Sequence, residues 1–104
     1  MAIRYYSIPH QKKTVAILEN TAMDCVNKIN KKVNNFCWCT DKYVMPNRFR
    51  VTVTCSAEDV YDEEVGRKMA KEKLLKRYYK HLDKRYNMFI KDLVELNNKV
   101  FENA

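Results

Sequence analysis

Glycine and proline are scarce in this chain, which has one Gly and two Pro among 104 residues. With 46% hydrophobic residues, such a chain can bury enough apolar surface to fold, and we expect no disordered region. The sequence also lacks a run of roughly 20 apolar residues and an apolar secretory segment at its N-terminus. We therefore expect no membrane span, no membrane partner, a cytoplasmic location and reduced cysteines.

Acidic residues are outnumbered, with 13 Asp and Glu against 20 Lys and Arg, and the net charge is +7. A surplus of this size favours negatively charged partners, such as a nucleic acid or an acidic protein surface. The length of 104 residues is that of a single domain with a modest core. We expect one α+β domain over residues 1–104.

Motifs for catalysis and metal binding are missing as well. The sequence has no Gly-rich phosphate loop, no nucleophile-elbow serine, no HExxH pattern and no carboxylate pair beside a base. Cys37 and Cys39 are separated by one residue, whereas zinc-binding cysteines more often have about two to four residues between them. His10 and His81 have no local partner of catalytic type. We predict a protein without enzymatic activity, cofactor or metal.

What the sequence does contain is a long helical pattern from Asp62 to Phe101, rich in helix-forming residues. An unbroken helix of this length would extend roughly 60 Å, so it must bend back or reach a partner. The sequence does not decide whether this helix is continuous or broken near residues 83–87. From Leu75 the apolar residues step by four and three, as in a coiled coil: Leu75, Tyr79, Leu82, Tyr86, Phe89, Leu93, Leu96 and Val100.

The first sixty residues contain shorter patterns. A helix is predicted over 21–34, because apolar residues alternate there with a polar face at helical spacing. A small, mostly antiparallel sheet is predicted from strands at 13–18, 36–40 and 48–55, and residues 3–8 and 12–18 suit a first hairpin. In this α+β fold the short amphipathic helix and the long C-terminal helix pack against the sheet.

Two candidate interaction surfaces follow from these patterns. Residues 67–85 are dense in Lys and Arg, and strand 48–55 places Arg48 and Arg50 on a polar face, although a solvated exterior is the simpler interpretation. The C-terminal repeat, within an extension at 86–104, predicts self-association. The binding candidates are Arg67, Lys68, Lys71, Lys76, Arg77, Arg48 and Arg50; the oligomerisation candidates are Leu82, Tyr86, Phe89, Leu93, Leu96 and Val100.

Two local resemblances add context. In the stretch from Thr54 to Ala70, a strand passes through an acidic turn into a helix with an early glycine, which resembles a segment of small phage and prophage proteins. This resemblance implies a phage-encoded accessory protein acting in the host cytoplasm. Separately, the helix opening Gly66-Arg67-Lys68-Met69-Ala70-Lys71 is similar to the last helix of double-stranded-RNA-binding domains, and implies that Arg67, Lys68 and Lys71 contact phosphates.

The leading hypothesis is a phage-type protein that inhibits or modulates a host or defence protein, alone or within a nucleoprotein complex, through its basic helix. The alternatives are direct, weakly sequence-specific binding of nucleic acid and a structural role in an assembly. In each case we expect a homo-oligomer.

Overall fold

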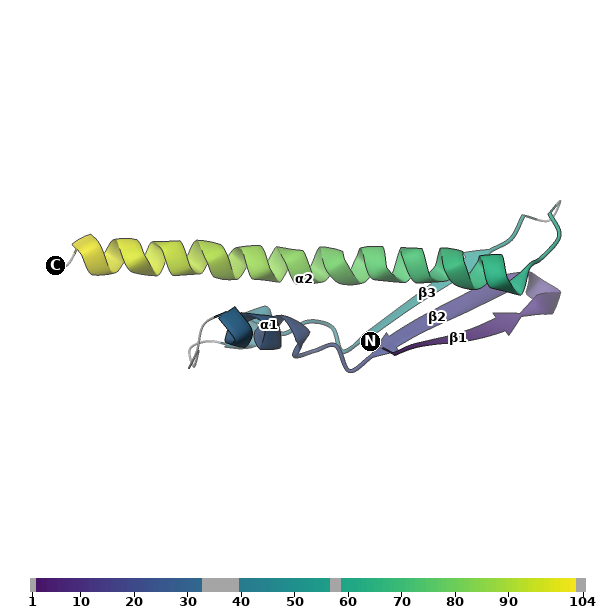
Figure 1. Ribbon diagram of the computed structural model, residues 1–104, viewed down its shortest axis with the longest axis horizontal. Helices are drawn as coiled ribbons and strands as arrows, with labels where there is room; N and C mark the ends of the chain where they lie inside the picture. The colour runs from purple at the N-terminus through teal and green to yellow at the C-terminus, as the bar shows by residue number, and fades with distance from the viewer. Residues whose placement is uncertain (1, 33–39, 57–58, 103–104) are drawn as a thin grey trace.

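The computed structural model of the protein describes residues 2–32, 40–56 and 59–102. These ranges form an α+β fold, as predicted, in which α2 lies above an antiparallel sheet and α1 (Figure 1). In chain order the elements are β1 (Ile3–Ile8), the 3-10 helix η1 (Pro9–Gln11), β2 (Lys13–Glu19), α1 (Asp24–Lys32), the 3-10 helix η2 (Thr40–Tyr43), β3 (Arg48–Thr54) and α2 (Glu63–Glu102).

The sheet is antiparallel, with β2 in the centre between β1 and β3. Alternate side chains of each strand point to opposite faces, and one face packs on α2. Ala16 lies opposite Val51 and Leu18 opposite Phe49, and all four side chains are buried with the inner side of α2. The opposite face, which includes Arg4, has no helix over it within the described ranges.

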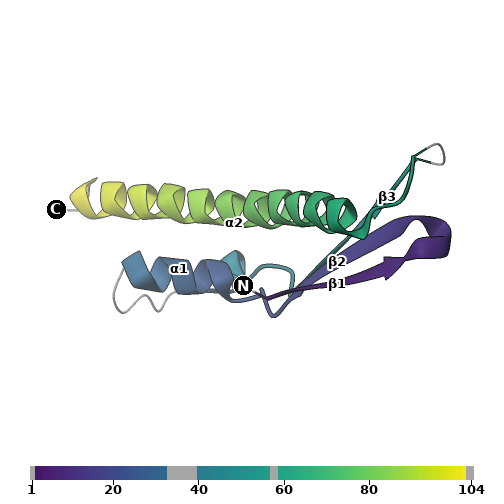
Figure 2. The ribbon, with the colours of Figure 1, turned by 45° about the vertical axis from the view of Figure 1, so that its right-hand side comes forward.

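The long helix α2 is continuous over 40 residues, which settles the question of a break near residues 83–87. Asp62 caps its start, because the Asp62 carboxylate accepts hydrogen bonds from the backbone N–H groups of Glu64 (2.9 Å) and Val65 (3.4 Å). The N-terminal half of α2 lies over the sheet, and the C-terminal half runs beside α1 (Figure 2). The molecule is elongated as a result, at 67 × 21 × 17 Å.

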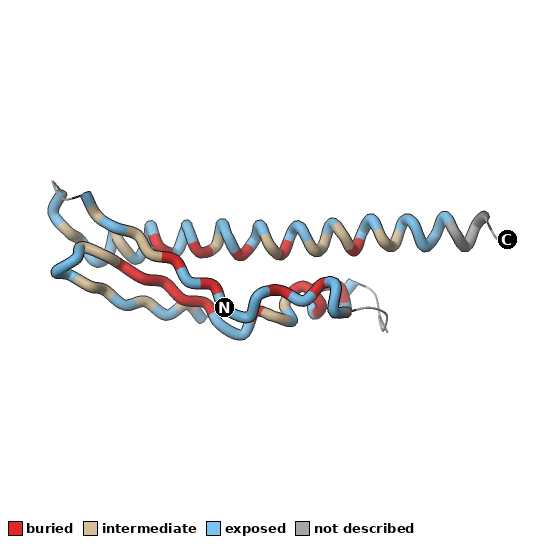
Figure 3. The backbone as a smooth tube through the Cα atoms, turned by 180° about the vertical axis from the view of Figure 1, so that it is seen from behind, coloured by how far each residue is buried: buried red, intermediate tan, exposed pale blue. Residues whose placement is uncertain are grey.

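The turn at η2 attaches the C-terminal half of α2 to the rest of the domain. Tyr43 is fully buried, with its ring edge-on to Phe89 at 5.9 Å, and its hydroxyl donates to the Asp92 carboxylate at 2.6 Å. Lys42 forms an ion pair with the same carboxylate at 2.8 Å. The contacts with Lys42 and Tyr43 lower the pKa of Asp92 below its usual value. Buried residues therefore continue along α2 well beyond the sheet (Figure 3).

Some predicted boundaries were wrong. The sheet also contains β1, which pairs with β2 as the suggested hairpin of residues 3–8 and 12–18 predicted. For the expected strand at 36–40, residues 36–39 lie outside the described ranges, and Thr40 begins η2. α1 begins at Asp24 because the residues before it bond to the Pro46–Asn47 segment: the Thr21 hydroxyl donates to the Pro46 carbonyl, and the backbone N–H of Ala22 donates to the Asn47 side chain.

The C-terminal repeat is used in part inside the protomer, so not all of it is left for the predicted self-association. Leu82 and Phe89 are buried in the core, so they are not available to a partner in this fold. Tyr86 and Leu93 are half-buried against the same core. Leu96 is 44% exposed, beyond the cover of η2. The side chain of Val100 lies outside the described residues.

Candidate functional site

Two basic side chains of α2 reach across the outer edge of β3. Lys73 donates to the backbone carbonyl of Thr52 at 3.1 Å, and Arg77 donates to the carbonyl of Arg50 at 3.5 Å. Carbonyls at the outer edge of a sheet have no strand partner, and charged side chains that bond to them protect the edge from pairing with another chain. The helix therefore caps this edge of the sheet with positive charge.

The row of cations continues along the same flank of α2. Lys73, Arg77, Lys80 and Lys84 follow a spacing of four, three and four residues, which places them on one side of a helix over about 17 Å. All four are exposed. We call these four residues, together with Arg48 and Arg50 of β3, the basic strip.

The two arginines of β3 lie on the sheet face that points away from α2. Arg50 donates to the Tyr6 hydroxyl at 3.2 Å, which orients its guanidinium over the neighbouring strands. Arg48 lies 3.6 Å from the carboxylate of Glu19, which also pairs with Arg4 at 2.7 Å. Glu19 therefore neutralises part of the charge that Arg48 contributes, whereas among the described residues no ion pair is formed by Lys73, Arg77, Lys80 or Lys84.

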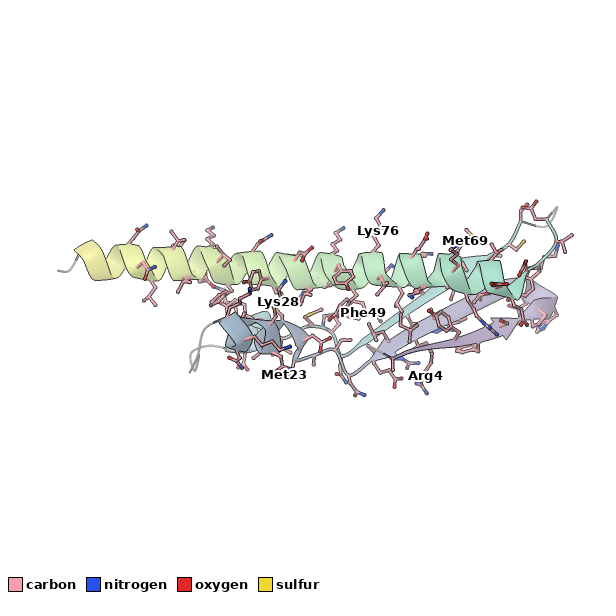
Figure 4. All side chains as sticks on the ribbon, viewed as in Figure 1. Arg4, Met23, Lys28, Phe49, Met69 and Lys76 are labelled. Carbon is pink, nitrogen blue, oxygen red and sulfur yellow. The ribbon has the colours of Figure 1, made fainter. Side chains whose placement is uncertain are left out.

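The predicted binding residues are divided by the fold. Arg77 donates to the backbone carbonyl of Arg50, whereas the side chains of Arg48 and Arg50 lie on the sheet face away from α2. Arg67 pairs with Glu63 one turn earlier, at 3.7 Å. Lys76 points away from the sheet, on the side opposite to Arg4 (Figure 4). Lys68 and Lys71 lie on other flanks of α2, because a helix turns by about 100° per residue.

The sequence interpretation of the site missed the row formed by Lys73, Lys80 and Lys84, although all three belong to the basic half of the helix. The signal that could have revealed it is the spacing of these lysines from Arg77. What the sequence could not supply is which flank of α2 lies beside β3.

His81 lies beneath the basic strip. Its ring is 5.3 Å from that of Phe49, and its Nδ1 accepts a hydrogen bond from Arg85 at 3.0 Å. Burial lowers the pKa of His81, and the positive charges of Arg85, Lys84 and Lys80 lower it further. The histidine is therefore neutral at pH 7, and the charge of the strip comes from Lys and Arg.

A cavity of about 460 Å³ lies where the chain enters α2, with Val53, Val65 and Met69 in its wall. The Tyr61 hydroxyl shares a hydrogen bond of 2.7 Å with the Thr14 hydroxyl, so these two polar groups already have partners. The lining is mainly apolar. Of its charged side chains, Lys12 donates to the Asp59 carbonyl at 2.8 Å and Asp62 caps α2, and we assign the cavity no function.

In the described part of the chain, no three His, Cys, Asp or Glu side chains come together as a metal site. Cys25 is buried and Cys55 half-buried, both as free thiols, and burial raises the pKa of Cys25. Cys37 and Cys39 lie outside the described residues. A search of the described helices finds none with the length and apolar character needed to cross a bilayer.

Comparison of the chain with protein-family models, with curated proteins and with solved structures found no match. The geometry and charge of the described residues therefore carry the functional argument.

Proposed function

We propose that the protein is a non-catalytic binding protein that engages an anionic macromolecule through the basic strip. The observation that carries this proposal is the unbroken row of Lys73, Arg77, Lys80 and Lys84 on one flank of α2. The acidic residues of this segment are exposed: Glu72 is roughly 100° around the helix from Lys73, and Asp83 roughly 100° from Lys84, so neither lies in the row.

A nucleic-acid backbone is the partner that this geometry favours. Its phosphates form a line of negative charge, and each lysine that neutralises a phosphate releases a counterion. A stable protein interface instead needs a buried aromatic or apolar centre, where lysine is depleted. Contacts of this kind are made with phosphates and carry no base specificity, so binding would be only weakly sequence-specific.

An acidic face of a host or defence protein is the second candidate, and it agrees with the resemblance to phage accessory proteins. One observation favours it: Val44 is 37% exposed, and its carbonyl accepts a hydrogen bond at 3.0 Å from Arg85, the residue that follows Lys84. An apolar side chain beside a row of cations could serve as an anchor for a protein partner.

The test compares two double variants in binding to a generic DNA or RNA duplex, followed by fluorescence anisotropy over a salt series. Lys80→Glu with Lys84→Glu reverses the charge at two residues of the strip for which the described part of the chain shows no hydrogen bond to a backbone carbonyl. Lys68→Glu with Lys76→Glu changes the net charge equally on other flanks and is the matched control. We expect the strip variant to weaken binding about tenfold or more, and the control only slightly.

A salt series separates the candidates further. Lys80→Gln with Lys84→Gln should reduce the slope of log affinity against log salt by about 2, one unit for each lost phosphate contact. Absence of binding at low salt would reject the nucleic-acid partner. The protein partner would then be tested by capture from host lysate with nuclease present, using the same two double variants. Equal effects of both variants would show that net charge, and no particular strip, governs binding.

A further inference from the structure

The hydrogen-bond pattern at the β3 edge determines which residues of β1 point their backbone groups away from the sheet. Arg50 turns its carbonyl outward to Arg77, so it makes no ladder bond to Ile17, the β2 residue opposite it. Ile17 therefore bonds on its other side to Arg4 of β1. Because this pattern alternates along a strand, the residues on either side of Arg4 point their N–H and C=O groups away from the sheet. These outward residues are Ile3, Tyr5 and Ser7.

The outer edge of β1 has none of the protection found at β3. Among the described residues no strand lies beside it, and no Lys or Arg side chain donates to its carbonyls. The register with β2 is regular over all six residues of the strand, so no bulge turns the edge away. An open, regular edge of this kind is a site for the addition of another strand.

We propose that β1 pairs with β1 of a second copy of the chain, antiparallel about a two-fold axis at Tyr5. This register joins the strands over residues 3–7 and places Arg4 opposite Tyr6 of the second copy, twice by symmetry. An arginine over a tyrosine ring is an attractive cross-strand pair. A shift of the axis to Arg4 would oppose two arginines, which is unfavourable.

The argument for a second copy, instead of an unrelated strand, is closure. Pairing through β1 joins two three-stranded sheets and leaves only the two β3 edges at the ends. Both ends are capped by Lys73 and Arg77, so no open edge remains and the assembly stops at a dimer. The basic strips stay exposed at the two ends, so this inference does not depend on the proposed function.

The flank of α2 above β1 supports the same interface. Tyr79 is about 200° from Arg77 around the helix, and Leu75 about 200° from Lys73, so these apolar residues lie on the side remote from the β3 edge. Tyr79 is 46% exposed and Leu75 is half-buried. In the dimer both helices lie over the same face of the joined sheet, with these flanks toward each other across the paired β1 strands.

The test uses sedimentation of the full chain over a range of concentrations. Tyr6 is 43% exposed on the sheet face away from α2 and is not part of the core that packs on α2. Tyr6→Lys places a second cation opposite Arg4 of the partner copy and should raise the dimer dissociation constant about tenfold or more. Tyr6→Glu, a change of similar size at the same position, places a carboxylate there and should leave dimerisation intact or strengthen it.

Two further measurements locate the interface. Ser7→Pro removes an outward N–H without touching the ladder to β2, so it should weaken the dimer while the far-ultraviolet circular dichroism stays unchanged. Hydrogen exchange at the amides of Ile3, Tyr5 and Ser7 should slow as protein concentration rises. A chain that sediments as a monomer at about 200 µM overturns the proposal. So does a dimer that Leu96→Asp dissociates and Tyr6→Lys does not.

Discussion

Gly66 and Thr14 form the closest approach between α2 and the sheet: a Cβ atom at position 66 would lie 2.3 Å from the Oγ1 atom of Thr14. Thr14 cannot easily move, because its side chain is fully buried and its hydroxyl is bonded to Tyr61 at 2.7 Å. The only glycine of the chain is therefore required where the helix begins to cross the central strand.

We expect Gly66→Ala to destabilise the protein in spite of its favourable effect on the helix. Alanine in place of glycine within a helix stabilises by about 1 kcal/mol. Overpacking a rigid contact costs about 1–3 kcal/mol, and here the neighbour is a β-branched side chain with little freedom to rotate. The net loss should be about 1 kcal/mol, measured as a lower free energy of unfolding in urea.

The control is the double variant in which Thr14→Ala removes the clashing hydroxyl. If the contact explains the loss, the two substitutions are not additive, and Gly66→Ala should cost less in the Thr14→Ala background than in the wild type. Equal costs in both backgrounds would mean that the approach of helix to strand is not what requires the glycine.

The second prediction separates the two ends of the C-terminal repeat. Phe89→Ala should destabilise the protomer by about 3–5 kcal/mol, because it empties a buried site beside Tyr43. Leu96→Ala, at an exposed position of the same repeat, should cost less than about 1 kcal/mol. Both values come from thermal unfolding at several protein concentrations. If Phe89→Ala lowered the stability only at high protein concentration, Phe89 would instead belong to an interface between copies of the chain.

Parts of this fold could be predicted from local pattern. The alternation from Arg48 to Cys55 predicted β3, and the helical spacing after Asp62 predicted α2, because both signals depend on neighbouring residues alone. The boundary of α1 was missed because the bonds of Thr21 and Ala22 go to Pro46 and Asn47, which are distant in the sequence.

The candidate site and the C-terminal repeat were harder to predict for the same reason. The repeat was interpreted as an assembly surface because nothing local shows that Tyr43, in a short 3-10 turn, covers Phe89. The binding residues were chosen by density of charge. The row formed by Arg77 with its neighbouring lysines depends on which flank of α2 lies against β3, and that is a property of the packed fold.

The last prediction concerns pH. The folded protein holds the pKa of His81 below its usual value of 6.5, first by burial and then through Arg85 and the nearby lysines. The unfolded chain therefore binds the proton more readily, and stability should fall as pH drops through about 6.5. His81→Gln cannot take up a proton but keeps an oxygen that accepts from Arg85, so this variant should lose stability less steeply between about pH 7 and pH 5.

His10→Gln, at an exposed position, is the matched control and should keep the wild-type slope. A second loss of stability belongs to Asp92, whose pKa is lowered by Lys42 and Tyr43. The stabilisation from a carboxylate with a lowered pKa is present above the unfolded value of 3.8 and disappears only as the pH falls through the folded value, so the two windows do not overlap. If His81→Gln and His10→Gln had the same slope above pH 5, the Arg85–His81 contact would have no part in the acid sensitivity of the protein.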